Sequence, residues 1–137
     1  MPSAFFTIGR IVFALPFAIF GIEHFAKGES MAKAVPIPGG VFWVYFTGVA
    51  LLAGAVGIIT KVLGKWASLC LAALMLVFIV FVHIPGLGNA EQRDMNLINL
   101  FKDLALCGGA IGFAGYFAEQ EQLSHVVPSP TARHAEV

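Results

Sequence analysis

Four long apolar blocks constrain this chain more than any other feature of its sequence. They lie at residues 5–22, 41–60, 66–82 and 98–118. Each block is close to the ~20 residues that an α-helix needs to cross a bilayer core of ~30 Å. The blocks lack the alternation of apolar and polar residues that marks membrane β-strands. The sequence therefore predicts an all-α membrane domain at residues 1–118, with its four spans packed as a four-helix bundle, and a flexible polar tail at residues 119–137.

The composition agrees with a chain that is solvated by lipid. Hydrophobic residues make up 58% of its 137 residues and charged residues only 12%, whereas a soluble domain carries about 25% charged residues. The polar side chains are too few to cover a surface that faces water, so the lipid bilayer is the expected partner. The formal net charge is zero, and the sequence therefore lacks the basic footprint of a nucleic-acid-binding protein.

Positive charges indicate how the spans cross the membrane. An even number of spans places both termini on one side. Arg10 and the lysines of the short turn at residues 61–65 favour the cytoplasm for that side. The opposite side also carries basic residues, so the bias is small: Lys27, Lys33, Arg93 and Lys102. We expect Arg10 itself to extend along its helix to the phosphate headgroups.

Polar residues that are far apart in the sequence are expected to meet at the other membrane face. With four spans, the ends of the first and third helices and the beginning of the fourth lie on that face. The candidate pocket residues are Glu23, His24, His83, Asn99, Lys102 and Asp103. Asn96, Asn99 and Asp103 follow helical spacing and share one side of the fourth helix. We therefore predict a polar pocket at this level of the bundle.

Asp103 is the residue in this set that most needs a partner. At a rise of 1.5 Å per residue it lies about 10 Å deeper than Asn96, where a carboxylate is costly in contact with lipid. We expect Lys102 or Asp103 to pair across helices with Glu23, His24 or His83. An ordinary alternative stays open, because Asn and Asp also favour helix N-termini and Lys102 can extend to the interface.

The cysteines and glycines carry less information. Cys70 and Cys107 lie inside apolar blocks without metal-ligand spacing, so we expect no metal site, and a redox role for them is left open. The spacing Gly108-x-x-x-Gly112 is typical of close helix contacts, which we expect within the bundle. A dimer would use the same spacing, and the oligomeric state is therefore open. The sequence also leaves open whether the loop at residues 36–40 dips back into the bilayer.

The sequence resembles the DoxX family of small bacterial inner-membrane proteins. The stretches that carry the resemblance are GRIVFALPFAIFGIEHF (9–25), PIPGGVFWVYFTGVALLAGAVGII (36–59), HIPG (83–86) and NLFKDLALCGGAIGFA (99–114). The resemblance implies a four-helix bundle in the bacterial inner membrane. Some DoxX-like proteins are linked to quinone-coupled oxidation of sulfur compounds, and others are regarded as membrane partners of redox or detoxification proteins. The family has no generally accepted catalytic motif, so no catalytic residue is carried over.

Two functions remain open at this point. The first is a membrane anchor or accessory subunit of a redox or stress-related system, with a membrane or periplasmic protein partner. The second is a quinone-interacting oxidoreductase subunit with a polar site at the non-cytoplasmic face. In that case His24 or His83 would exchange protons, because an imidazole titrates near neutral pH. Side chains that converge on a cavity open to lipid would favour the quinone; side chains splayed into water would favour the anchor.

Overall fold

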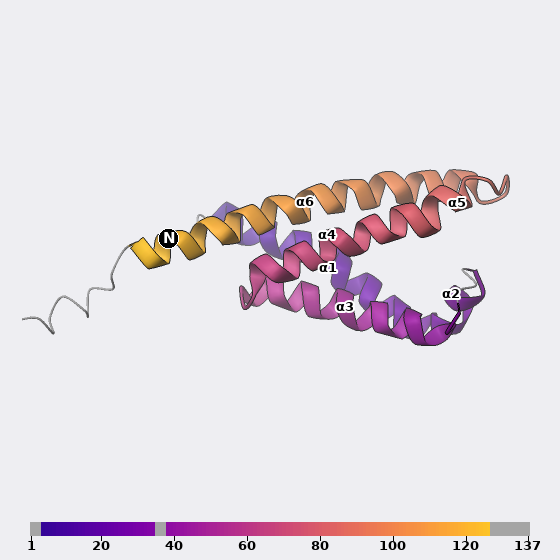
Figure 1. Cartoon of the computed structure of the whole chain (residues 1–137), viewed down its shortest axis with the longest axis horizontal. Helices are drawn as coiled ribbons and strands as arrows, with labels where there is room; N and C mark the ends of the chain where they lie inside the picture. Colours follow the sequence, from indigo (N-terminus) through magenta and orange to yellow (C-terminus); the bar gives the residue numbers. More distant parts are fainter. Residues whose placement is uncertain (1–3, 35–37, 127–137) are drawn as a thin grey trace, which may run out of the picture.

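The computed structural model describes residues 4–34 and 38–126 of the chain. The long helices are α1 (Ala4–Ala26), α3 (Val41–Thr60) and α6 (Arg93–Val126) (Figure 1). The remaining long helix is continuous but composite, and consists of α4 (Gly64–Phe78), η1 (Ile79–His83) and α5 (Ile84–Gly86). The short helix α2 (Gly28–Ala34) lies in the first connection. The described residues contain no strand, which confirms the all-α class.

The surface of the bundle is suited to lipid. Four helices in the described part are long and apolar enough to cross a membrane. Large apolar side chains point outward along them; Phe5 is 87% exposed, Phe81 69% and Phe42 62%. A monomeric soluble protein rarely exposes apolar patches of that extent. The chain is therefore an integral membrane protein whose outer surface meets hydrocarbon.

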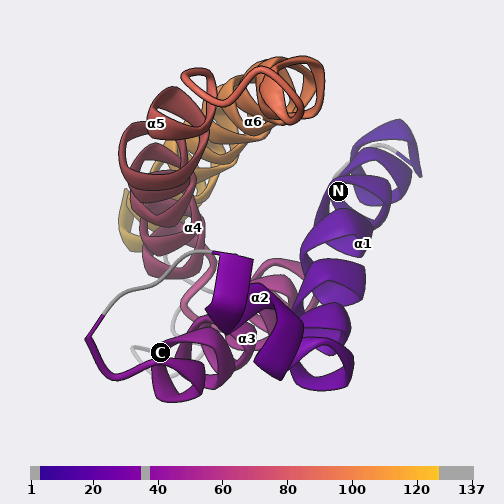
Figure 2. The ribbon, with the colours of Figure 1, turned by 90° about the vertical axis from the view of Figure 1, so that its right-hand side faces the viewer.

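The helices are arranged as a chain of neighbours. α1 packs along α3, α3 packs on α4, and α4 packs along α6 (Figure 2). α1 and α6 meet through aromatic rings in the first half of α1, where the centroids of Phe6 and Tyr116 are 3.7 Å apart and those of Phe13 and Phe113 4.8 Å apart. Figure 2 shows the two helices standing apart at the end that carries α2 and α5.

Glycines permit the close helix contacts. A Cβ at Gly54 would lie 2.5 Å from Leu71, so α3 approaches α4 closely there. A Cβ at Gly109 would likewise lie 2.5 Å from the ring of Phe13, where α6 meets α1. Because lipid gives little hydrophobic drive for helix association, such contacts supply much of the packing.

The Gly108-x-x-x-Gly112 spacing does not serve these contacts. A Cβ at either glycine would meet nothing within 4 Å, so the expectation that this pair packs inside the bundle is wrong. The reason is helical geometry. Gly109 points inward, and its neighbour Gly108 is turned about 100° away from it. This face of α6 is open to the surroundings of the bundle.

Arg10 lies in the bundle and not at the headgroups. Its side chain is buried, with 6% exposure, and its Nη1 donates hydrogen bonds to the carbonyls of Ile58 (3.1 Å) and Ile59 (2.7 Å). The last carbonyls of a helix have no partners within it and carry the negative end of the helix dipole. The guanidinium therefore caps α3, and the expected contact of Arg10 with phosphates is wrong.

α6 continues well past the end of the predicted span at residue 118. It remains helical to Val126, and Lys65 at the start of α4 forms an ion pair with Glu121 (2.6 Å). A helix of this length measures about 50 Å, which exceeds a bilayer core of ~30 Å. The first residues of the predicted tail are thus helical, and residues 127–137 lie outside the described part.

The connection between α2 and α3 ends in a tight turn. Gly39 and Gly40 have φ angles of 99° and 50°, which favour glycine, and Trp43 Nε1 donates a hydrogen bond to the Pro38 carbonyl (2.9 Å). These contacts fix the start of α3. Residues 35–37 lie outside the described part, so a return of this loop into the bilayer stays an open question.

Candidate functional site

A buried histidine–carboxylate pair joins two helices at the open end of the bundle. His83 Nε2 lies 2.9 Å from Asp103 Oδ2, and the two residues are 9% and 3% exposed. The prediction that Lys102 or Asp103 pairs across helices is therefore confirmed. A carboxylate in the apolar interior is stable only when it is paired and hydrogen-bonded. His83 provides that partner for Asp103.

The local backbone brings His83 to this position. His83 is the last residue of the π-helical segment η1, and Pro85 follows it in α5. Proline lacks an N–H and crowds the carbonyl four residues earlier, which disfavours a regular α-helix at this point. A π turn inserts a residue and so rotates the following side chains by about 100° relative to a regular helix. The π turn before Pro85 thus sets the direction of the imidazole.

The other nitrogen of His83 faces Asn96. Nδ1 lies 3.4 Å from Asn96 Oδ1, and Asn96 Nδ2 donates to the Gln92 carbonyl (3.0 Å), which fixes the orientation of the amide. Both ring contacts are hydrogen bonds only when both nitrogens carry protons, which is the imidazolium form. A Cβ at Gly86 would overlap the Asn96 amide. Gly86 therefore makes room for this second contact.

Lys102 lies next to Asp103 on α6 and belongs to the same set of polar side chains. Its Nζ lies 3.5 Å from Asp103 Oδ1 and 4.3 Å from the centroid of the Phe20 ring on α1. The ammonium is thus held between a carboxylate and an aromatic face, both of which attract a cation. The side chain remains 39% exposed, and an ammonium has three donors. Lys102 therefore retains a donor for a further partner.

His24 reaches the same region from α1. Its Nδ1 lies 2.7 Å from the Phe20 carbonyl, and its ring is stacked on Phe78 of α4 at a centroid distance of 6.2 Å. Glu23 also borders this region, and it accepts a hydrogen bond from Lys27 (2.9 Å), four residues further along the chain. The two neighbours on α1 therefore have different surroundings: His24 is held by the bundle, and Glu23 belongs to an exposed ion pair.

These groups surround one cavity of about 440 Å³. All six residues of the predicted polar pocket line it: Glu23, His24, His83, Asn99, Lys102 and Asp103. Its other walls are apolar side chains that sequence reasoning did not single out: Phe20, Met31, Met75, Phe78 and Val82. The signal for these walls was available in principle, since Phe20 is four residues before His24 and Val82 is adjacent to His83. That this cavity is a functional site stays a prediction.

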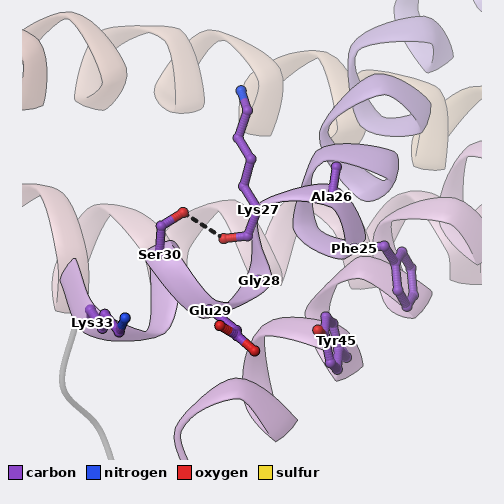
Figure 3. Close-up of a pocket in the computed structure, with 8 residues that line it drawn as sticks. All are labelled: Phe25, Ala26, Lys27, Gly28, Glu29, Ser30, Lys33 and Tyr45. Atoms are coloured by element: carbon purple, nitrogen blue, oxygen red, sulfur yellow. Dashed lines mark hydrogen bonds between the residues drawn. The ribbon is translucent and has the colours of Figure 1, made fainter.

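A second cavity lies outside the bundle, at the corner between α1 and α2 (Figure 3). It measures about 450 Å³ and borders Lys27, Glu29, Lys33 and Tyr45. Figure 3 shows Lys27 pointing away from Glu29 and Tyr45, and Ser30 donating a hydrogen bond to the Lys27 carbonyl. Its charged groups do not converge as those of the first cavity do. The first cavity is therefore the better candidate for a ligand site.

The cysteines do not contribute to the cavity. Cys107 is buried and its Sγ lies 3.6 Å from the Ala72 carbonyl, whereas Cys70 is exposed on the outer surface. Both are free thiols. Among the described residues, no group of three or more His, Cys, Asp and Glu side chains is placed to hold a metal ion.

The fold and the cavity define the structural class of the protein. The protein is a multi-pass α-helical membrane protein with a polar cavity between its helices at one end. The DoxX family model matches residues 5–84, which is more than half of the chain. The chain belongs to the DoxX family. No curated protein and no solved structure matches it.

The DoxX family match covers only some of the residues that line the cavity. Glu23, His24 and His83 lie within the matched residues, and the polar residues of α6 lie beyond them. The cavity is therefore built from the family region and from a helix that the match does not reach.

Proposed function

We propose that the chain is a membrane subunit of a redox system in the bacterial inner membrane, and that its cavity takes the headgroup of a quinone from the lipid. The observation that carries this proposal is the convergence of six polar side chains from α1, η1 and α6 on one cavity with apolar walls. Small-molecule sites are mostly apolar and carry a few convergent polar groups. A simple anchor would have no need for this convergence.

The chemistry of the lining residues suits a quinone ring. Quinone oxygens accept hydrogen bonds, and the ammonium group of Lys102 can donate one to a bound quinone. Asn99 offers an amide that makes no hydrogen bond to the described residues. The rings of Phe20 and Phe78 stand on the wall and can cover the faces of a flat ligand. The donors would bind the carbonyl oxygens, while the rings hold the apolar part.

A lipid-soluble ligand also has a route to the cavity. Side chains of α1 and α6 meet in the first half of α1, at Phe6 and Phe13, and the two helices stand apart at the end where the cavity lies (Figure 2). An isoprenoid tail could remain in the bilayer between the two helices while the headgroup occupies the cavity. With the termini in the cytoplasm, as the distribution of basic residues favours, the cavity would face the periplasm.

The C-terminal part of α6 favours an accessory role within a larger system. The helix is longer than a bilayer core requires, and its last turns carry exposed polar side chains that include Glu119, Gln120 and Gln122. The ion pair between Lys65 and Glu121 fixes this arm to the bundle. We propose that the arm contacts a protein partner of the redox system.

Ligand binding tests the proposed function directly. The full chain is placed in lipid nanodiscs with decylubiquinone, and the retained ligand is measured by mass spectrometry against empty nanodiscs. We expect retention by the wild type and binding that is weaker by roughly ten- to a hundredfold in Lys102→Met, because a hydrogen bond from a charged donor contributes about 1.5–3 kcal/mol. Glu121→Gln, at the other end of the bundle, is the control and should bind as the wild type does. Retention no greater than in empty nanodiscs would reject the proposal.

A further inference from the structure

We infer that the two histidines of the cavity have different roles, and that His24 makes the site prefer a ligand with a hydroxyl group. His24 presents a free ring nitrogen to the ligand, and His83 positions Asp103. This inference rests on the proposed function and specifies it further. The preferred ligand is an alkylated hydroquinone, the reduced form of a quinone, or a phenol of the same shape.

The hydrogen bond of His24 determines which of its two ring nitrogens carries the proton. Its Nδ1 lies 2.7 Å from the Phe20 carbonyl, and a carbonyl oxygen can only accept. Nδ1 must therefore carry the hydrogen of that bond. In the neutral imidazole the other nitrogen, Nε2, is then an acceptor. Among the described residues nothing donates to it, and His24 lines the cavity.

His83 has no nitrogen left for a ligand. Its Nε2 is bound to Asp103 at 2.9 Å, and its Nδ1 faces Asn96 at 3.4 Å. A ligand could reach either nitrogen only by displacing a protein partner from a buried group. His83 is therefore a positioning residue: it holds the Asp103 carboxylate, which in turn lies beside the Lys102 ammonium.

The other acceptors that line the cavity differ from His24 in the partners that they already have. Glu23 Oε1 pairs with Lys27, and the two Asp103 oxygens pair with His83 and Lys102. Asn99 carries both an acceptor and donors on one amide, so it can serve a carbonyl or a hydroxyl equally well. Carboxylates keep further lone pairs beside these partners, so they can also accept from a hydroxyl. The single acceptor site of the neutral His24 ring has no protein partner in the described part of the chain, and we assign the preference for a hydroxyl over a carbonyl to it.

The ligand class follows from this arrangement. A hydroquinone hydroxyl can donate to His24 Nε2, while an oxygen of the same ligand accepts from Lys102. A quinone carbonyl placed at His24 would bring two acceptors together, which leaves both without a hydrogen. Sites built to bind a hydroxyl discriminate against analogues that lack it, because a buried polar group is then unpaired.

A matched set of ligands tests the inference. The probes are 2-decylhydroquinone, its dimethyl ether and 2-decyl-1,4-benzoquinone, each bound to the full chain in nanodiscs under anaerobic conditions. The three probes share the six-carbon ring skeleton and the decyl tail, and only the hydroquinone carries hydroxyl groups. We expect the wild type to bind the hydroquinone about tenfold more tightly than the dimethyl ether, as one good hydrogen bond in a buried site provides.

The variant His24→Phe removes Nε2 but keeps an aromatic ring beside Phe78. It should bind the dimethyl ether as the wild type does, which shows that the cavity is intact, and should lose the preference for the hydroquinone. If the wild type binds the hydroquinone and the ether equally, or if the preference survives in His24→Phe, the inference is overturned while quinone binding stands. If none of the three probes binds to the wild type, the proposed function itself fails.

A spectroscopic measurement avoids any variant. The ¹⁵N chemical shifts of the imidazoles, recorded on the ¹⁵N-histidine-labelled chain in detergent micelles at pH 8, report which nitrogen carries the proton. We expect the neutral imidazole of His24 to carry its proton on Nδ1. A His24 with its proton on Nε2 would overturn the inference, because the nitrogen facing the ligand would then be a donor.

Discussion

His83 and Asp103 are brought together by two different helices, and the imidazole Nε2 lies 2.9 Å from the carboxylate Oδ2 in a buried setting. Twenty residues separate them along the chain. The contact joins the π turn before Pro85 to the first half of α6, and it fixes the polar side of the cavity. The pair therefore links the stability of the bundle to the geometry of the site.

Breaking this pair should destabilise the bundle. We expect Asp103→Leu to lower the free energy of unfolding by about 3 kcal/mol, because it leaves the His83 donor unpaired in an apolar interior. Asp103→Asn should lower it less, since an amide oxygen can still accept from Nε2. Reversible unfolding in mixed micelles measures both values.

A double-mutant cycle separates the pair from the general effect of substitution. The cycle of His83→Leu and Asp103→Leu should give a coupling energy of about 1.5–3 kcal/mol, as for a hydrogen bond to a charged group. Additive effects of the two substitutions would show that the contact contributes nothing.

Removing the guanidinium of Arg10 should loosen the end of α3. We expect Arg10→Leu to destabilise the bundle by about 2 kcal/mol, because the carbonyls of Ile58 and Ile59 lose a charged donor at the negative end of the helix. Lys33→Ala removes an exposed cation and serves as the control, with a change within about 0.5 kcal/mol. Equal stability of Arg10→Leu and the wild type would contradict the capping role.

Two glycines on α6, Gly109 and Gly112, should respond differently to alanine. Gly109→Ala places a Cβ 2.5 Å from the Phe13 ring, whereas Gly112→Ala meets nothing within 4 Å. We expect Gly109→Ala to be destabilising and Gly112→Ala to be neutral or up to about 1 kcal/mol stabilising, since alanine is the better helix former. Thermal unfolding of the two variants in one detergent tests the difference, and equal midpoints would show that α6 does not pack on Phe13 as described.

The two cysteines should differ in their reaction with N-ethylmaleimide. Cys70 is exposed and Cys107 is buried against the Ala72 carbonyl. The native protein in detergent should gain the label at Cys70 and gain the second label only after denaturation. Mass spectrometry of proteolytic fragments assigns each label. Rapid native labelling of Cys107 would show that α4 and α6 separate readily.

Much of the architecture could be predicted from the sequence, because the bilayer sets the length of its helices. The four apolar blocks indicated four helices, and the alternating direction of successive crossings placed Glu23, His24, His83 and the start of α6 at one level. The structure brings all six of the predicted pocket residues to one cavity. Topology alone was sufficient for that result, since it needs no knowledge of side-chain packing.

What the sequence could not show depends on local packing. The π turn at residues 79–83 arises from the competition between helix hydrogen bonds and Pro85, whose outcome depends on neighbouring helices. Arg10 was expected at the headgroups because its helix partner could not be known; the free carbonyls of α3 hold it instead. Likewise, Gly108 and Gly112 have the spacing of a contact face, but the rotation of α6 directs Gly109 inward.

Photo-crosslinking reports directly where a quinone headgroup binds on the bundle. A ubiquinone analogue with an azido group on its ring is irradiated with the full chain in lipid nanodiscs, and the labelled peptides are identified by mass spectrometry. The account predicts label at the end of α1, near Phe20 and His24, and on α6 near Asn99 and Lys102, with competition by unlabelled decylubiquinone. Label concentrated at the other end of the bundle, near Arg10 and residues 61–65, or label that decylubiquinone does not displace, would contradict it.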